Sequence, residues 1–240
     1  MPISEVHLID CMEFMRTCKD KQFDLTIVDP PYGIGAPNMG ATPCQRKNGS
    51  NRLNSGSGKL KDRILNVSNC DWDNNIPSEE YFNELFRISK NQIIWGGNYF
   101  NLPASRCFVV WDKVQPWENF SQVEMAWTSF DSPARIYKFD NRTGDKIHPT
   151  QKPVALYKWL LKNYAKPGDK IFDSHMGSQS SRIACYDGGF DYWGCELDED
   201  YFRDGCKRFE RHRRQLDLFT ESQPPHLQPE LSTAQYEIFR

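Results

Sequence analysis

Short apolar runs alternate with segments of helical spacing along the chain, and this alternation predicts an α/β fold. The predicted strands lie at 5–9, 23–28, 92–95, 107–111, 122–127, 134–139, 170–172 and 192–195. The predicted helices lie at 10–18, 78–90, 153–164 and 178–187, and from 198 to about 214. Continuous apolar runs such as 23–28 are typical of strands that are covered on both faces. The runs 122–127 and 134–139 are expected to pair with each other as antiparallel strands.

Residues typical of helix ends support these bounds. Asp10 and Glu13 have the spacing of a capping box, and Ser78 can cap the second helix. Pro153 suits the first turn of a helix, and the glycines at 188–189 stop the helix before them. No internal repeat is evident, and the polar tail after residue 215 has no periodicity.

The predicted strand-helix-strand unit at 170–195 indicates the kind of ligand. A dinucleotide fold would carry G-x-G-x-x-G to bring the backbone against a pyrophosphate, but the segment 173–179 has one glycine, Gly177. Gly33 and Gly35 do not complete that pattern either, because no third glycine falls in register. Glu196 ends the next strand, where it can accept both ribose hydroxyl hydrogens. The pattern predicts a nucleoside site without phosphates, with a solvent-facing strand end as the alternative for Glu196.

The segment Asp29, Pro30, Pro31, Tyr32 follows the apolar run 23–28. Two prolines remove two backbone donors and fix φ twice, so this loop is stiff and rich in acceptors. The Asp29 carboxylate and the Pro30 carbonyl can hold the two N–H bonds of an exocyclic amine and favour the positive charge that develops during methylation. Tyr32 can stack on an extruded base. The alternative is a proline turn after a buried strand.

Four segments in this order resemble the S-adenosylmethionine-dependent amino-methyltransferases of DNA, which methylate adenine N6 or cytosine N4. They are Asp29–Tyr32, the segment 148–153 (HPTQKP), the segment 172–178 (FDSHMGS) and the strand end 192–196 (YWGCE). With the target-base motif first and the cofactor loop late, the chain resembles the permuted beta group. The resemblance implies a doubly wound, mostly parallel α/β sheet of the class I methyltransferase (Rossmann-like) type.

The resemblance also implies roles on the cofactor side. The S-adenosylmethionine ammonium is expected to meet Asp173, and its carboxylate is expected to meet Lys152 or backbone N–H groups near Ser178. The strand end at Asp10 and Cys11 lies by the cofactor's adenine in the family, although Asp10 as a plain helix cap is the alternative. We also expect Asp29 to lie near the cofactor.

The cofactor loop departs from the family pattern, where Asp-Pro-Phe-x-Gly-Ser-Gly-Thr is usual. Here Ser174 replaces the proline and Gln179 replaces the second glycine. We expect a looser loop, or one reshaped around His175 and Gln179, with Gly177 as the remaining glycine. His175 is expected to pack or hydrogen-bond, because the methylated amine can shed its proton to water or Asp29 without a strong base.

Composition fits one domain of 240 residues with a net charge of −2. We expect a catalytic domain at 1–214 with a small insert at about 113–147, and a polar, proline-containing tail at 215–240. No apolar stretch is long enough for a membrane span and no signal pattern is present, so the protein is expected to be cytoplasmic. The eight cysteines contain no C-x-x-C pair, which favours reduced thiols and no metal site.

A basic loop at about 36–63 follows the predicted base-binding segment. Its cations are Arg46, Lys47, Arg52, Lys59, Lys61 and Arg63. Because the DNA strand that carries a flipped base has to pass nearby, we expect these cations to contact DNA phosphates. A solvated surface linker is the alternative.

The sequence therefore predicts a site-specific DNA methyltransferase acting on adenine N6 by direct in-line transfer. Methylation of cytosine N4 is the second interpretation; RNA methylation and methylation of a protein glutamine amide are further ones, and a non-catalytic DNA-binding relative is a different class. The expected partner is double-stranded DNA, and a homodimer and a cognate restriction enzyme fit the resemblance.

Overall fold

The computed structural model describes residues 2–35, 51–52, 64–65, 73–116, 121–140, 146–148 and 150–221, without the side chains of 51–52, 64–65 and 216–221. In this part of the chain one eight-stranded sheet has the order β1-β10-β9-β2-β5-β7-β6-β8. Its strands are β1 (Ser4–Leu8), β2 (Phe23–Val28), β5 (Ser89–Trp95), β6 (Phe108–Asp112), β7 (Val123–Thr128), β8 (Arg135–Lys138), β9 (Lys170–Asp173) and β10 (Asp191–Glu196). The short strands β3 (Asn51–Arg52) and β4 (Ile64–Leu65) pair separately.

The first five strands in this order run parallel, and β7 is antiparallel to both of its neighbours. The predicted pairing of 122–127 with 134–139 is wrong: β7 lies between β5 and β6, and β8 pairs in parallel with the outer edge of β6. Neighbours in sequence usually pair, which is why the sequence favoured β7 with β8. The mostly exposed β8 suits an edge, whereas Ala126 and Thr128 of β7 are buried.

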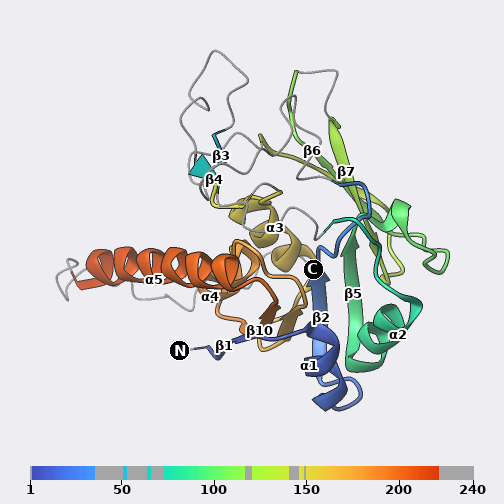
Figure 1. Cartoon of the computed structure of the whole chain (residues 1–240), viewed down its shortest axis with the longest axis horizontal. Helices are drawn as coiled ribbons and strands as arrows, with labels where there is room; N and C mark the ends of the chain where they lie inside the picture. Colours follow the sequence, from blue (N-terminus) through green and yellow to red (C-terminus); the bar gives the residue numbers. More distant parts are fainter. Residues whose placement is uncertain are drawn as a thin grey trace, which may run out of the picture.

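Helices cover both faces of the sheet (Figure 1), as a doubly wound fold requires. Helices α1 (Cys11–Thr17) and α2 (Glu79–Ile88) bury Met15 and Leu85 against one face. Helices α3 (Val154–Tyr164) and α4 (Ser180–Gly188) bury Leu156 and Ala184 against the other. The predicted doubly wound α/β fold is confirmed.

The helix ends largely follow the sequence signals. Asp10 caps α1, since its Oδ1 accepts the Met12 N–H at 2.7 Å, and Gly189 ends α4 with a φ of 73°. The last helix, α5 (Glu199–Glu221), runs beyond its predicted end near residue 214. A polar composition does not by itself end a helix, because helical turns can consist of polar residues. Residues 222–240 lie outside the described ranges.

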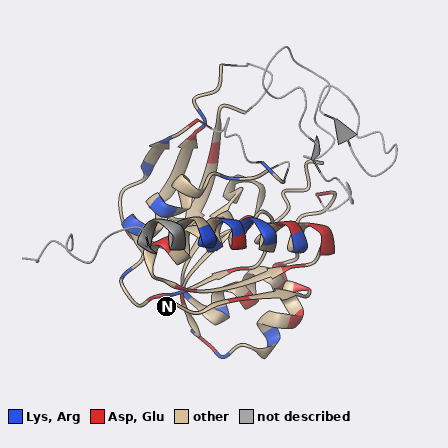
Figure 2. Ribbon diagram, turned by 90° about the vertical axis from the view of Figure 1, so that its left-hand side faces the viewer, with Lys and Arg blue, Asp and Glu red and all other residues tan. Residues whose placement is uncertain are grey.

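Two further expectations concern the chain as a whole. Residues of the predicted insert at 113–147 form β7 and β8 of the main sheet and not a separate unit. No helix in the described ranges has the length and apolar character of a membrane span. Figure 2 shows cationic and acidic residues interspersed along α5, where Arg203 pairs with Asp200 and Arg213 with Glu210.

Candidate active site

Four acids follow the carboxyl ends of adjacent parallel strands. Asp10 comes after β1, Glu196 ends β10, Asp173 ends β9 and Asp29 comes after β2. The chain leaves β9 towards β10 through α4 and leaves β2 towards β5 through α2, on opposite faces. The strand order therefore reverses between β9 and β2, and ligands of open α/β sheets bind at such a point.

The loop after β2 is held by an acid that the sequence analysis missed. Asp73 is buried, and its Oδ1 accepts the N–H of Tyr32 at 2.5 Å and that of Gly33 at 3.0 Å. Pro30 and Pro31 have no N–H, so Asp73 binds the first two donors after Asp29. Gly33 has a φ of 71°, a conformation that glycine adopts without strain. No short motif marks Asp73, because it lies far away in the sequence.

The Asp29 carboxylate is engaged through both oxygens. Its Oδ1 accepts the Tyr32 hydroxyl at 2.5 Å, and its Oδ2 lies 2.5 Å from Lys152 Nζ. Burial raises the pKa of Asp29, and the Lys152 ammonium opposes that rise. Burial and the adjacent Asp29 charge raise the pKa of Tyr32, which stays a neutral donor.

The Lys152 ammonium lies between two carboxylates of the protein. Its side chain is buried between Asp29 and Glu124, whose Oε2 lies 3.0 Å from Nζ. Its ammonium also lies 5.2 Å from the ring centre of Trp95. Burial lowers the pKa of Lys152, but Asp29 and Glu124 outweigh it and raise the pKa. Because Pro153 keeps Lys152 extended and outside α3, its side chain reaches the base side of the crevice.

Glu124, which the sequence analysis did not name, and Lys113 complete this charged group. Glu124 lies opposite Trp111 in the β6–β7 pair, and side-chain alternation puts it on the same face of the sheet as Ala126. Lys113 follows two residues after Trp111 and reaches Glu124 Oε1 at 2.6 Å. Burial raises the pKa of Glu124, but Lys152 and Lys113 outweigh it and lower the pKa to about 2. The sequence did carry one signal for Glu124, because it is the single acid in an otherwise apolar strand.

Aromatic residues surround Tyr32. Tyr99 stacks on it with ring centres 5.1 Å apart and an angle of 16° between planes. A Cβ at Gly96 would lie 2.2 Å from the Tyr32 ring, so only glycine permits this approach. Tyr99 is 43% exposed on the short 3-10 helix η2 (Gly97–Tyr99), whereas Trp95 is fully buried. Tyr99 is thus an accessible aromatic residue beside Tyr32.

On the cofactor side, Asp173 is bound by neutral donors. Its Oδ2 accepts the Ser181 hydroxyl at 2.6 Å and its Oδ1 accepts the His175 N–H at 3.0 Å. Burial raises the pKa of Asp173 to about 7, against the lowering effect of these hydrogen bonds. A cation that entered beside Asp173 would favour its ionised form.

Glu196 is held in a similar way by backbone groups. Its Oε2 accepts the Gly177 N–H at 2.9 Å, and its Oε1 accepts those of Leu197 at 2.9 Å and Asp198 at 3.0 Å. The φ of Gly177 is 44°, which brings the cofactor loop over the end of β10. The carboxylate is thus fixed by three N–H groups at the strand end.

Two residues of the cofactor loop, His175 and Gln179, have distinctive local environments. His175 Nδ1 lies 2.8 Å from Ser174 Oγ, which in turn lies 2.7 Å from the Tyr81 hydroxyl. Burial lowers the pKa of His175 to about 4, so the ring is neutral near pH 7. Gln179 adopts a left-handed φ of 58°, the conformation that the missing glycine would take easily.

Helix α5 stabilises the cofactor loop through hydrogen bonds. The Gln179 amide donates to the Phe202 carbonyl at 3.3 Å, and Arg208 donates to the Ser178 carbonyl at 2.7 Å. The Ser178 side chain is buried beside Ser180. These contacts offset the strain at Gln179.

The remaining predicted residues divide into two groups. Asp10 caps α1, and burial raises the pKa of Cys11 to about 12, so its thiol is inert. The six cysteines in the described part of the chain are free thiols, and no metal-ligand cluster occurs among the described residues. The basic-loop residues Arg46, Lys47, Lys59, Lys61 and Arg63 lie outside the described ranges, and Arg52 is described only by its backbone in β3.

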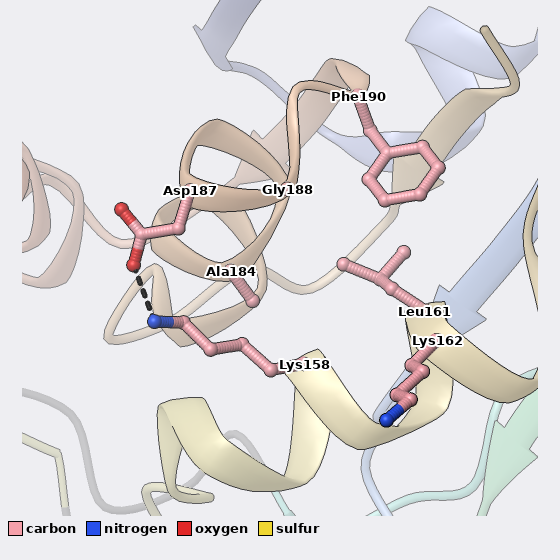
Figure 3. Close-up of a pocket in the computed structure, with 7 residues that line it drawn as sticks. All are labelled: Lys158, Leu161, Lys162, Ala184, Asp187, Gly188 and Phe190. Carbon is pink, nitrogen blue, oxygen red and sulfur yellow. Dashed lines mark ion pairs between the residues drawn. The ribbon is translucent and has the colours of Figure 1, made fainter. Parts of the chain in front are cut away.

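A hollow of about 250 Å³ between α3 and α4 contains none of the predicted site residues (Figure 3). It is lined by Lys158, Leu161, Lys162, Ala184, Asp187, Gly188 and Phe190. Asp187 and Gly188 precede β10, so the hollow lies towards the amino ends of the strands. The acids at the carboxyl ends remain the candidate site.

Comparison with known proteins found a family model, relatives and solved structures that are similar to this chain. Residues 94–207 match the family model N6_N4_Mtase, described as DNA methylase. This part of the chain is therefore similar to the N6/N4 DNA methylases. The matched range includes Lys113, Glu124, Lys152, Asp173 and Glu196 of the candidate site.

Two curated relatives are similar over parts of the chain. YubD of Escherichia coli (strain K12), described as a methylase, is 34% identical over 74 residues, which are 31% of this chain and 33% of that protein. The Type II methyltransferase M2.DpnII of Streptococcus pneumoniae is 25% identical over 148 residues, 62% of this chain and 52% of that protein. The chain thus spans about a third and about half of their lengths.

Solved structures share the fold. The M1.HpyAVI–SAM complex is 19% identical with a TM-score of 0.54, covering 85% of this chain and 98% of that one. The cytosine-N4-specific PvuII DNA methyltransferase is 11% identical with a TM-score of 0.54, covering 92% and 95%. The predicted class I methyltransferase fold is confirmed.

Proposed function

We propose that the protein transfers a methyl group from S-adenosylmethionine to adenine N6 in DNA. The observation that carries this proposal is the Asp29 carboxylate, held at the reversal of the strand order by Lys152 and the Tyr32 hydroxyl. It lies next along the sheet to Asp173 and Glu196, which fit a cationic nucleoside. One edge of the sheet thus offers an acceptor for an amine beside a site for a methyl donor.

The residues present fit the cofactor. Glu196 is fixed by three backbone N–H groups and retains lone pairs that can accept ribose hydroxyls. Asp173 has a pKa raised to about 7 by burial, and an ammonium group nearby would favour its charge. When bound, S-adenosylmethionine supplies an electrophilic methyl group on a sulfonium.

On the base side, Asp29 and the Pro30 carbonyl accept the two N–H bonds of the exocyclic amine. The amine nitrogen forms a bond to the methyl carbon as the carbon–sulfur bond breaks, so positive charge moves towards Asp29. The proton leaves afterwards to Asp29 or to water. No covalent bond to the protein is needed.

Cytosine N4 is the second candidate. The fold of the chain is as similar to the cytosine-N4-specific PvuII enzyme as to M1.HpyAVI, with a TM-score of 0.54 for each. Aspartate at position 29 favours adenine as a tendency of the family that the sequence resembles. A non-catalytic relative would fail to bind the cofactor or to turn it over.

The deciding experiment incubates the protein with unmethylated bacterial genomic DNA and S-adenosylmethionine carrying a labelled methyl group. Digestion to nucleosides should give labelled N6-methyldeoxyadenosine. Label in N4-methyldeoxycytidine would select the second candidate, and label only in RNA or protein substrates would replace DNA as the substrate. Cofactor binding without any transfer would indicate the non-catalytic class.

Double-stranded DNA is the proposed partner, and the basic loop is its proposed phosphate contact. Replacing Arg46, Lys47 and Arg52 with alanine should flatten the slope of log affinity against log salt by up to about 2.7, since each phosphate contact contributes about 0.9. Sequence preference should not change, because phosphate contacts do not read bases. Parallel salt dependences for both proteins would make the loop a solvated linker. A homodimer and a cognate restriction enzyme are further proposals, which sedimentation and a cleavage assay on methylated DNA would test.

A further inference from the structure

Four side chains of alternating charge form a row that starts at the proposed base site. Asp29 Oδ2 lies 2.5 Å from Lys152 Nζ, which lies 3.0 Å from Glu124 Oε2, and Glu124 Oε1 lies 2.6 Å from Lys113 Nζ. Each of these side chains is largely shielded from solvent. Buried charges need partners, so the position of each member depends on the next.

Both oxygens of Asp29 are already engaged at the place where the amine has to bind. Its Oδ1 is bound by the Tyr32 hydroxyl and its Oδ2 by Lys152. Lys152, however, has a second acceptor within reach. Glu124 Oε2 is buried and makes no well-oriented hydrogen bond to any described residue, although the Lys152 ammonium lies 3.0 Å away.

We propose that Glu124 is a positioning residue for methyl transfer, which takes up the Lys152 ammonium when the target amine binds Asp29. A hydrogen bond moves from Asp29 to Glu124, and no proton is transferred. Lys113 keeps Glu124 ionised for this purpose. The inference rests on the proposed function.

Electrostatics favour such an exchange. Positive charge develops on the amine during transfer, and an ammonium 2.5 Å from Asp29 weakens the stabilisation that the carboxylate can give. Movement of Lys152 towards Glu124 restores it, and the positive charge that develops on the amine then replaces the ammonium as the partner of Asp29. The ionisable groups that face Glu124 are Lys113 at the end of β6, Lys152 before α3, Tyr157 on α3, and Asp29 and Tyr32 after β2.

The test is a double-mutant cycle of Glu124→Gln and Lys152→Met, read as labelled methyl incorporation into unmethylated genomic DNA. Glu124→Gln should lower kcat about 10- to 100-fold, because misplacement near the reacting groups has effects of that size. Cofactor affinity should stay within about twofold of wild type, since Glu124 lies on the base side. Adding Glu124→Gln to the Lys152→Met variant should lower kcat by less than about a further twofold. The proposal would be overturned if the kcat losses of the two single variants multiply in the double variant, or if Glu124→Gln leaves kcat unchanged.

A second measurement does not depend on turnover by Lys152→Met. In Lys113→Met the carboxyl group of Glu124 loses one of the two cations that lower its pKa, so it should take up a proton at higher pH than in wild type. Its kcat should approach that of Glu124→Gln as the pH falls and recover as the pH rises. A profile parallel to that of wild type contradicts the role of Glu124.

The matched control is Asp24→Asn, which removes a 2.6 Å ion pair with Lys90 at the other end of β2. Its kcat and pH profile should match wild type, and melting curves of all variants report folding separately. A wild type that methylates no DNA defeats the proposed function, whereas an active wild type with an equally active Glu124→Gln defeats only this inference.

Discussion

The two sides of the crevice hold their carboxylates by different means. On the base side, Asp29 and Glu124 are paired with Lys152 and Lys113, so the charges cancel. On the cofactor side, Asp173 and Glu196 accept hydrogen bonds from hydroxyl and backbone N–H groups, and no ion pair joins either acid to a cation in the described part of the chain.

This difference matches the two ligands proposed. A nucleobase is neutral, and a balanced set of charges can hold its amine without attracting free ions. S-adenosylmethionine carries an ammonium and a sulfonium, which favour a site with uncompensated negative charge. The same strand edge thus offers two electrostatic environments.

The largest effect is expected from a substitution that disrupts the base side alone. Asp29→Ala removes the acceptor of the amine and should lower methyl transfer more than about 1,000-fold, because charge developing in the transition state loses its partner. Cofactor affinity by calorimetry should be nearly unchanged. The near-isosteric Asp29→Asn controls for the loss of packing, and comparable turnover by Asp29→Ala would contradict the catalytic role.

Breaking the cofactor side should give the reverse pattern. Glu196→Ala removes two hydrogen bonds to ribose, worth about 1.5–3 kcal/mol each on the general scale, and should weaken cofactor binding at least tenfold. Glu199→Ala, an exposed neighbour at the start of α5, is the matched control and should bind normally. Equal affinities for both variants would exclude Glu196 from the site.

The uncompensated charge on the cofactor side should make binding depend on pH. The pKa of Asp173 is about 7 because burial opposes ionisation, and a bound ammonium favours the ionised form. Binding must therefore release a proton below this pKa, and affinity should fall about tenfold for each pH unit below it. Calorimetry between about pH 5 and 8, in buffers of different ionisation enthalpy, measures both quantities. Asp173→Asn should bind weakly at every pH; a pH dependence unchanged in this variant would point to another group.

A smaller effect should come from the aromatic wall of the base side. Tyr99 is exposed and stacks on Tyr32, so it can contact an extruded base. Tyr99→Ala should raise KM for DNA by the equivalent of about 1 kcal/mol or more, as for the loss of one base-stacking contact, while cofactor affinity stays constant. Tyr99→Trp should retain activity. An unchanged KM in Tyr99→Ala would leave Tyr99 as a surface residue.

Local signals predicted most of the strands, the cap at Asp10 and the acids at the strand ends. These features depend on neighbours in sequence: an apolar run, a helix start, or a residue that follows a strand. The position of β7 between β5 and β6 was missed, because an antiparallel strand can pair with either neighbour and only burial decides between them. The extension of α5 to Glu221 was missed because composition changes before the helix ends.

The sequence by itself determined the α/β order of elements, the donor-poor Asp29–Tyr32 loop and the presence of Asp173 and Glu196 at strand ends. Only the tertiary structure decided that Lys152 turns to Asp29, that Asp73 binds the loop, and that Glu124 and Lys113 join the site. Those contacts depend on the register of β6 with β7 and on where the segment before α3 docks. The residues involved lie far apart along the chain, and the need to pair buried charges brings them together only once the sheet has formed.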